Sequence, residues 1–274
     1  MNLKNNLFRL TGKIQHYQWG GYHFIPELLH LANPEHQPFA EYWLGAHDNA
    51  PAEMDAGEGG KIKLNEYISR HPEVLGKKVR ETFGRLPYLL KVLDVRDMLS
   101  IQVHPSKKAA VAEFERENQE GIALTAPDRN YRDDNHKPEL MVALSDFWLL
   151  HGFKSADKIR ETIRSTEEFD FMLPLFDSGG HKKLYNTLME MDQQEVNRIL
   201  EPLLVRMGAA YECNYLSKDN PHFWAARAAA TFNQPGRIDR GIFSIYLLNL
   251  VNLKKGEAIF QDAGVLHAYL EGQN

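Results

Sequence analysis

The sequence predicts a mainly β protein with an all-helical insertion. Short apolar runs rich in β-branched and aromatic residues, bounded by turn residues, fill residues 1–154 and return in 233–274, as is typical of strands. Between them, residues 155–232 carry apolar side chains at helical spacing, most clearly from Val196 to Leu204. We therefore expect a β domain interrupted by a helical domain, with separate successive domains as the alternative.

Residues 1–105 are expected to hold mostly strands with short helices. The stretches YHFIPELL (22–29) and LNEYISRHPEVLG (64–76) favour helices. The apolar runs LPYLLKVLDV (86–95) and LSIQVHP (99–105) favour strands that are buried on at least one face.

The run at 99–105 contains two polar residues two positions apart, Gln102 and His104. Residues i and i+2 of a strand share a face. The amide and the imidazole are therefore expected to point the same way, while Ile101 and Val103 point to the other side. A lone strand histidine is more often a hydrogen-bonded core residue, so this pair alone is weak evidence for a site.

After this run we expect a helix over 106–121, with Ser106 as its N-cap and Gly121 as its stop. A polar, turn-rich loop follows over 122–140, and loops of this kind often carry function. Strand-like alternation returns over 140–153.

The loop ends in DNHKPEL (134–140), where ionisable side chains crowd around Pro138. Proline keeps the local backbone extended, so Lys137 and Glu139 are expected to face the same side. A carboxylate beside a lysine suits a metal ion together with an anionic or carbonyl substrate. The alternative is a solvated charged loop.

The helical segment has its own boundary signals. Asp192 begins a capping-box pattern, and Asn220 with Pro221 marks another helix start. We expect residues 244–272 to return to strands, with a turn at KKG (254–256).

The last strands contain a spacing that resembles the second motif of the cupin superfamily. Gly256, Gly264 and His267 match it, whereas Asp262 stands where proline is usual and Glu271 where asparagine is usual. In cupins this histidine is a metal ligand inside a small barrel. The resemblance implies a cupin-type (jelly-roll) β-barrel.

Three separate motifs together supply two imidazoles, one carboxylate and one amide, from His104, His267, Glu139 and Gln102. These four groups carry only one formal negative charge, so a bound Zn²⁺ would stay net positive and act as a Lewis acid. Water or a substrate oxygen would complete its coordination.

Almost the whole chain resembles the type I mannose-6-phosphate isomerases (phosphomannose isomerases). The motifs that carry the resemblance are YQWG (17–20), AEYWLGAH (40–47), LPYLLKVLDV (86–95), LSIQVHPSK (99–107), NYRDDNHKPEL (130–140), LLNLVNLKKGEAIF (247–260) and HAYLEG (267–272).

The resemblance implies a site as well as a fold. It implies one zinc ion per chain, held by Gln102, His104, Glu139 and His267. It implies substrate contacts from Trp19, Glu41, Lys91, Ser100 and Tyr269. A lysine beside zinc suits proton transfer or oxyanion stabilisation, so we expect Lys137 to be catalytic; the alternative is His104, although a ligated imidazole is a poor base. Without the resemblance, Trp19 is expected to pack, Glu41 to form a surface ion pair, and Lys91 to extend from a strand edge.

The family interconverts mannose 6-phosphate and fructose 6-phosphate, for which a cis-enediol is the natural intermediate. Family members continue into an arginine-bearing segment and a second cupin-like β domain, which have no counterpart in these 274 residues. We therefore expect a fragment or a naturally short member. The alternatives are a non-catalytic zinc cupin that binds a sugar phosphate, and a different cupin enzyme such as an iron oxygenase, against which a glutamine ligand and the near-full-length resemblance argue.

Composition limits the partners. The net charge of −5 gives no basic excess for nucleic acid or an anionic membrane. The single cysteine, Cys213, favours a reducing compartment, and the N-terminal sequence lacks the apolar region of a signal peptide. We expect a cytoplasmic protein whose partner is a small sugar phosphate.

Overall fold

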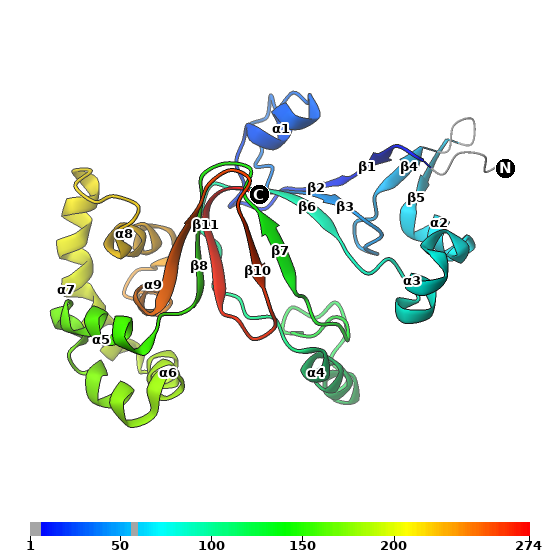
Figure 1. Cartoon of the computed structure of the whole chain (residues 1–274). Helices are drawn as coiled ribbons and strands as arrows, with labels where there is room; N and C mark the ends of the chain where they lie inside the picture. Colours follow the sequence, from blue (N-terminus) through cyan, green and yellow to red (C-terminus); the bar gives the residue numbers. More distant parts are fainter. Residues whose placement is uncertain (1–6, 56–59) are drawn as a thin grey trace. The chain divides into compact units, whose positions relative to one another are not determined.

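The computed structural model describes residues 7–55 and 60–274. The chain forms two compact units, one of Met1–Asp97 with Gln273–Asn274 and one of Met98–Gly272 (Figure 1). These boundaries differ from those expected at residues 154 and 232, and the division into three segments stays a prediction.

The first unit contains two small antiparallel sheets with strand orders β2-β3-β6 and β1-β4-β5. Their strands are β1 (Leu10–Thr11), β2 (Lys13–Gln15), β3 (Glu41–Leu44), β4 (Glu53–Asp55), β5 (Lys61–Lys63) and β6 (Leu90–Val95). The helices are α1 (Phe24–Leu29), α2 (Leu64–Arg70), the 3₁₀ helix η2 (Pro72–Leu75) and α3 (Gly76–Phe83). A core of Ile25, Phe39 and Tyr42 packs beside β3 and β6.

The predicted helix over 64–76 is divided in the structure. α2 ends at Arg70, because the residue before a proline is pushed out of the helical region; His71 has φ −130° and ψ 61°. The following helix α3 was not predicted from the sequence. Of its eight residues only Val79 and Phe83 are apolar, and none is buried, so the apolar pattern is too short to mark it.

The second unit holds two antiparallel groups of strands with orders β11-β8-β9 and β10-β7. The strands are β7 (Glu139–Val142), β8 (Phe147–Phe153), β9 (Leu248–Leu253), β10 (Ala258–Gln261) and β11 (His267–Gln273), whose last residue belongs to the first unit. β9 and β10 are joined at the predicted turn, where the Glu257 N–H donates to the Lys254 carbonyl at 2.8 Å.

Two strand predictions are wrong. Residues 99–105 form no strand; Gln102 makes an isolated bridge to His267, and Val103 is 54% exposed. Pro105 offers no N–H that could extend the pairing. Of the strands expected over 244–272, the first four residues instead belong to helix α9 (Ile242–Leu247), all of whose residues are buried. A short, fully buried apolar run does not reveal its period, so helix and strand look alike there.

The helical block is confirmed. It consists of α5 (Ala156–Arg164), η3 (Glu167–Phe169), α6 (Met172–Glu190), α7 (Gln193–Glu212) and α8 (Pro221–Phe232). The side chains of Asp192 and Asn220 cap α7 and α8 as predicted, accepting backbone N–H bonds at 2.8 and 2.9 Å. Ser106 caps the predicted helix α4 (Lys107–Gln119).

The helical block, α9 and the strands β8, β9 and β11 share one hydrophobic core. Trp224 and Phe169 of the helical block pack in the same buried cluster as Leu150 of β8, Leu248 of β9 and Leu270 of β11. In Figure 1 α8 and α9 lie beside β8 and β11. The helical block therefore packs against β11, the strand that carries His267.

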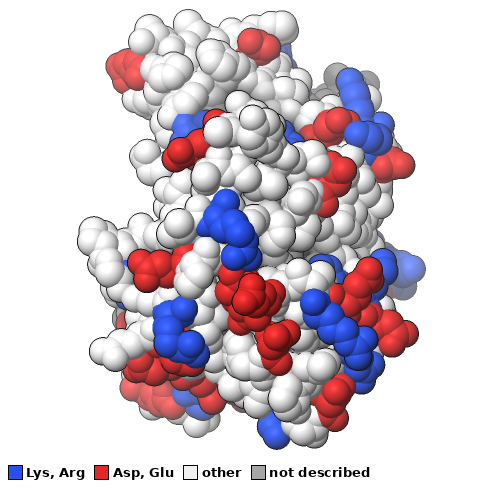
Figure 2. Space-filling model, turned by 90° about the vertical axis from the view of Figure 1, so that its left-hand side faces the viewer, with Lys and Arg blue, Asp and Glu red and all other residues white. Residues whose placement is uncertain are grey.

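Acidic and basic side chains are interspersed over the face that Figure 2 turns to the viewer. Across residues 7–55 and 60–274, no helix combines the length and the apolar character needed to span a membrane.

Candidate metal centre

Three potential metal ligands converge in the second unit. Nitrogen and oxygen atoms of His104, Glu139 and His267 all lie within 4.8 Å of one another. His104 Nε2 is 3.2 Å from Glu139 Oε1, and His267 Nε2 is 3.9 Å from Glu139 Oε2. The two imidazole rings are 5.1 Å apart between centroids. The structure thus brings together three of the four ligands that the family resemblance implies.

Each ligand stands where regular structure begins or ends. Glu139 is the first residue of β7, His267 is the first residue of β11, and His104 lies just before α4. The His104 carbonyl accepts a bond from the Gly264 N–H at 2.8 Å, which fixes this irregular segment against the turn before β11. Gly264 has φ +79°, a conformation that glycine adopts without strain.

The orientation of His267 suits a metal ligand. Its Nδ1 is 2.9 Å from the Val265 carbonyl, so Nδ1 carries the proton and Nε2 presents its lone pair toward Glu139. Metal-bound histidines usually donate their second ring N–H in this way. The side chain is buried, with 4% exposure, so its position is well defined by packing.

Gln102 lies beside His267, although not on a strand. The two residues exchange both backbone bonds, at 2.8 and 2.9 Å. Directly opposed residues of an antiparallel pair carry their side chains on the same face. Gln102 is exposed in the structure, and its role as fourth ligand stays a prediction.

The electrostatics of the cluster favour the protonation states that bind metal. Burial alone raises the pKa of Glu139, but the hydrogen bond and charge of His104, the charge of His267 and the Tyr269 hydroxyl outweigh it and lower the pKa. Burial lowers the pKa of His267. A carboxylate and a neutral imidazole are the forms that coordinate a metal at neutral pH.

This donor set fits zinc. Two imidazole nitrogens and one carboxylate oxygen are a common protein ligand set of catalytic zinc sites, which leave a position for water or substrate. Among the described residues, this is the group of histidine and carboxylate side chains close enough to hold a metal ion.

The predicted catalytic residue Lys137 lies on the loop before β7. Its side chain is 56% exposed, and its Nζ is 3.8 Å from Asp133 Oδ2. The loop itself is anchored by Arg129, which is buried against Glu117 of α4 at 3.1 Å. Arg129 also donates to the carbonyls of Ile122 and Tyr131.

The two predicted substrate residues of this unit differ in their surroundings. Ser100 is exposed. Tyr269 is buried, and its hydroxyl donates to Glu139 Oε2 at 3.2 Å. The Gln261 side chain lies against the same two groups, with Nε2 2.7 Å from the Tyr269 hydroxyl and 3.2 Å from Glu139 Oε2.

The first unit brings together two of its three predicted substrate residues. Lys91 Nζ is 3.3 Å from Glu41 Oε2 and 4.5 Å from the centre of the Trp43 ring, and Trp43 Nε1 donates to Glu41. Glu41 is buried, with 7% exposure. Trp19 stacks on Tyr17, with ring centroids 5.8 Å apart. Burial raises the pKa of Tyr17, and the charge of Glu41 raises it further.

A comparison with known families shows to which family this chain belongs. The family model of the phosphomannose isomerase type I catalytic domain matches residues 7–156. The chain belongs to the type I phosphomannose isomerase family.

Mannose-6-phosphate isomerases are similar to the chain over nearly all of its length. Those of Salmonella typhimurium and Escherichia coli are each 34% identical to it over 96% of the chain, and the human enzyme is 33% identical over 97%. The chain spans 66% of the length of the two bacterial relatives and 65% of the human one.

Solved structures of a phosphomannose isomerase match the fold. The Salmonella typhimurium mannose 6-phosphate isomerase bound to its substrate fructose 6-phosphate and zinc superposes with a TM-score of 0.83, 33% identity and 98% coverage of this chain. The chain covers 67% of that structure. A further match, bound with zinc and yttrium, has the same TM-score. The fold class predicted from the sequence is confirmed by these matches.

Three residues that contact the predicted site residues or anchor their loop in this phosphomannose isomerase family member were not predicted from the sequence. Trp43 stands two positions after Glu41 on β3, so the period of a strand could have placed it on the same face as Glu41. Gln261 stands two positions after Ile259 on β10, so alternation marks it as inward-facing. The burial of Arg129 could not be predicted from the sequence, because the residues of a buried ion pair in a charged loop have the same sequence pattern as those of a solvent-exposed pair.

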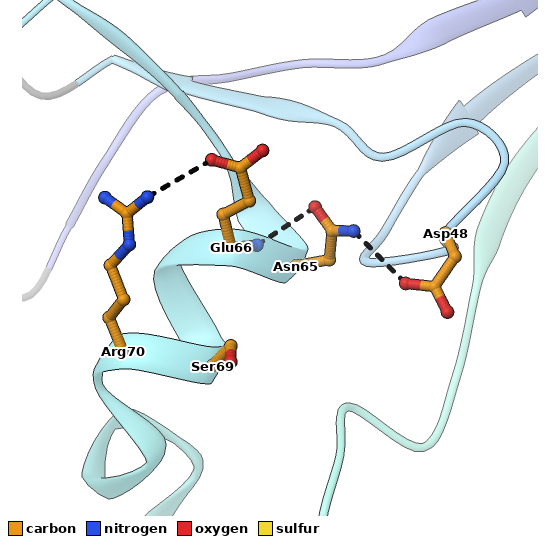
Figure 3. A pocket seen from close by; sticks show the side chains of 5 residues that line it. All are labelled: Asp48, Asn65, Glu66, Ser69 and Arg70. Atoms are coloured by element: carbon orange, nitrogen blue, oxygen red, sulfur yellow. Dashed lines mark hydrogen bonds and ion pairs between the residues drawn. The ribbon is translucent and has the colours of Figure 1, made fainter.

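A separate polar surface hollow lies at the start of α2 (Figure 3). Asp48, Asn65, Glu66, Ser69 and Arg70 line it. The Asn65 amide donates to Asp48 at 3.1 Å, and Arg70 is 3.5 Å from Glu66. None of the predicted site residues faces this hollow.

Proposed function

We propose that this protein is a zinc-dependent aldose–ketose isomerase that interconverts mannose 6-phosphate and fructose 6-phosphate. The observation that carries the proposal is the convergence of His104, Glu139 and His267 in a chain of the type I phosphomannose isomerase family. A relative that is 33% identical binds both zinc and fructose 6-phosphate.

In this proposal His104, Glu139 and His267 hold the zinc ion, with Gln102 as the fourth ligand. The paired backbones of Gln102 and His267 place their side chains on one face, which supports this assignment. When bound, zinc supplies positive charge for the oxygen atoms of the sugar carbonyl and of the enediol.

The reaction moves a proton between C2 and C1 of the sugar while the carbonyl moves in the opposite direction. A cis-enediol is the natural intermediate, and it requires a group that takes and returns the proton within hydrogen-bond reach. We assign proton transfer or oxyanion stabilisation to Lys137, which lies two residues before the ligand Glu139 on an anchored loop.

Substrate contacts are proposed for Trp19, Glu41, Lys91, Ser100 and Tyr269. An ammonium group neutralises a phosphate, and a hydroxyl donates to it, so Lys91 and Ser100 suit the phosphate end. The carboxylate of Glu41 holds Lys91 at 3.3 Å, which limits the directions in which that ammonium points.

The test is a coupled assay of mannose 6-phosphate conversion by the purified chain, before and after treatment with a chelator. Turnover is expected to disappear with the metal and to return when zinc is added. Turnover that withstands complete metal removal would contradict the metal role. Calorimetric binding of zinc and fructose 6-phosphate without any turnover would favour a non-catalytic sugar-phosphate-binding protein, and iron in the purified protein would revive the oxygenase interpretation.

The compartment belongs to the proposal as well. Cys213 is an exposed free thiol, and free thiols persist in reducing surroundings. We therefore propose a cytoplasmic location, which fits an enzyme that acts on phosphorylated sugars.

A further inference from the structure

The buried amide of Gln261 lies directly behind the ligand Glu139. The two residues are opposite each other in the β10–β7 ladder. Gln261 Nε2 is 3.2 Å from Glu139 Oε2 and 2.7 Å from the Tyr269 hydroxyl, which itself donates to the same Oε2 at 3.2 Å. The three side chains form a closed set of hydrogen bonds around one carboxylate oxygen.

The two oxygens of Glu139 consequently have different partners. Oε2 receives the Gln261 amide and the Tyr269 hydroxyl and lies 3.9 Å from His267 Nε2, whereas Oε1 faces His104 Nε2 at 3.2 Å. Two donors on Oε2 fix the rotation of the carboxylate and direct Oε1 toward the His104 imidazole. Hydrogen bonds to a ligating carboxylate orient it and tune its affinity for metal.

Burial of the Gln261 amide does not by itself stabilise the fold. It is 1% exposed, and its Oε1 is buried and accepts no hydrogen bond from any described residue. Burying one half of an amide without a partner lowers stability. The inward-facing neighbours in the same ladder, Met141 and Ile259, are apolar. A chain with an apolar residue at position 261 would fold at least as well. The amide is therefore explained by its hydrogen bond to Glu139 and not by packing in the core.

We propose that Gln261 is a positioning residue of the metal centre, which acts with Tyr269 to hold Glu139 in the orientation that binds zinc. This inference rests on the metal site of the proposed function. It assigns to Gln261 no contact with substrate and no part in proton transfer.

The test compares Gln261→Leu with the unchanged chain. Leucine has nearly the same size but no amide, so it removes the bond to Glu139 and also the unpartnered Oε1. Zinc affinity of the metal-free protein, measured by competition with a chromophoric chelator, is expected to fall by about 10–100-fold. The melting temperature of the metal-free Gln261→Leu protein is expected to equal or exceed that of the unchanged chain.

Two matched variants sharpen the test. Ile259→Val alters the packing of the same strand face without touching Glu139, and it is expected to leave zinc affinity within twofold. Tyr269→Phe is expected to weaken zinc binding, and the double variant with Gln261→Leu should lose less than the product of the two single effects, because both groups act on Oε2.

Three results would overturn the positioning role. They are zinc affinity of Gln261→Leu within twofold of the unchanged chain, an equal loss in Ile259→Val, or a melting temperature of the metal-free Gln261→Leu protein that falls along with its affinity. Failure of the unchanged chain to convert mannose 6-phosphate would count against the proposed function, yet the affinity comparison would still decide the role of Gln261.

Discussion

Gln102 and His267 face each other across an isolated antiparallel bridge and exchange both backbone hydrogen bonds, at 2.8 and 2.9 Å. This pairing depends on the main chain and not on the glutamine side chain. Gln102→Ala is therefore expected to fold normally but to bind zinc at least about tenfold more weakly, as measured by chelator competition. Unchanged affinity in this variant would remove Gln102 from the ligand set.

The phosphate role of Lys91 is open to a kinetic test. Lys91→Met keeps the length of the side chain and removes its charge. The KM for mannose 6-phosphate is expected to rise by about tenfold or more, since a charge-assisted bond to phosphate is lost, while zinc content stays unchanged. Lys77→Met is the matched control, because Lys77 is exposed on the surface of α3. A KM that stays the same in Lys91→Met would contradict the assignment.

The buried pair of Arg129 and Glu117 is expected to control the loop that ends at Glu139. Arg129→Met would leave the Glu117 carboxylate buried without its cation, which typically costs about 3–5 kcal/mol. Urea denaturation should show a loss of this size, and zinc affinity should fall as the loop loosens. Arg132→Met, at an exposed position of the same loop, should change neither quantity. A loss of stability below about 1 kcal/mol for Arg129→Met would contradict this role.

The ion pairs of Glu271 give stability a pH dependence. Burial raises the pKa of Glu271, but hydrogen bonds and charge from Lys218 and Arg227 outweigh it and lower the pKa. A carboxyl group whose pKa is lower in the folded state stabilises the protein above its unfolded pKa of about 4.3. This contribution is lost as the pH falls through the lowered value.

Glu271→Gln is accordingly expected to be less stable than the unchanged chain at pH 7. The side chain is 31% exposed, so solvent screening reduces the difference to about 1–2 kcal/mol. Thermal melts of both proteins between pH 3 and pH 7 should converge toward the acid end. A difference that stays constant over this range would show that the two ion pairs are not its cause.

The sequence predicted the helical block and singled out His104, Glu139 and His267, which the structure brings together. Clean helical spacing around Val196 and cap residues such as Asn220 are local signals. The segments around His104, Glu139 and His267 carry recognisable motifs. Helices, helix caps and short motifs can therefore be predicted from the sequence, because each depends on residues that are close together in the chain.

The strand predicted over 99–105 failed because pairing is not local. Its apolar alternation matched a strand, but it meets β11 only through the isolated bridge at Gln102 and one bond from the Leu99 N–H to the Tyr269 carbonyl, and Val103 remains 54% exposed. The position of Gln261 behind Glu139 likewise depends on the β10–β7 register, which joins residues 122 positions apart. No pattern within either segment contains that register.

The most direct test of the metal centre is the zinc content of the purified chain after dialysis at neutral pH, compared with that of Glu139→Gln. The substitution keeps the size of the side chain and removes the charge that two imidazoles surround. Glu115→Gln, at an exposed position of α4, is the matched control. We expect about one zinc ion per chain in the unchanged protein and in the control, and almost none in Glu139→Gln. Equal zinc content in all three proteins would contradict a metal centre built on His104, Glu139 and His267.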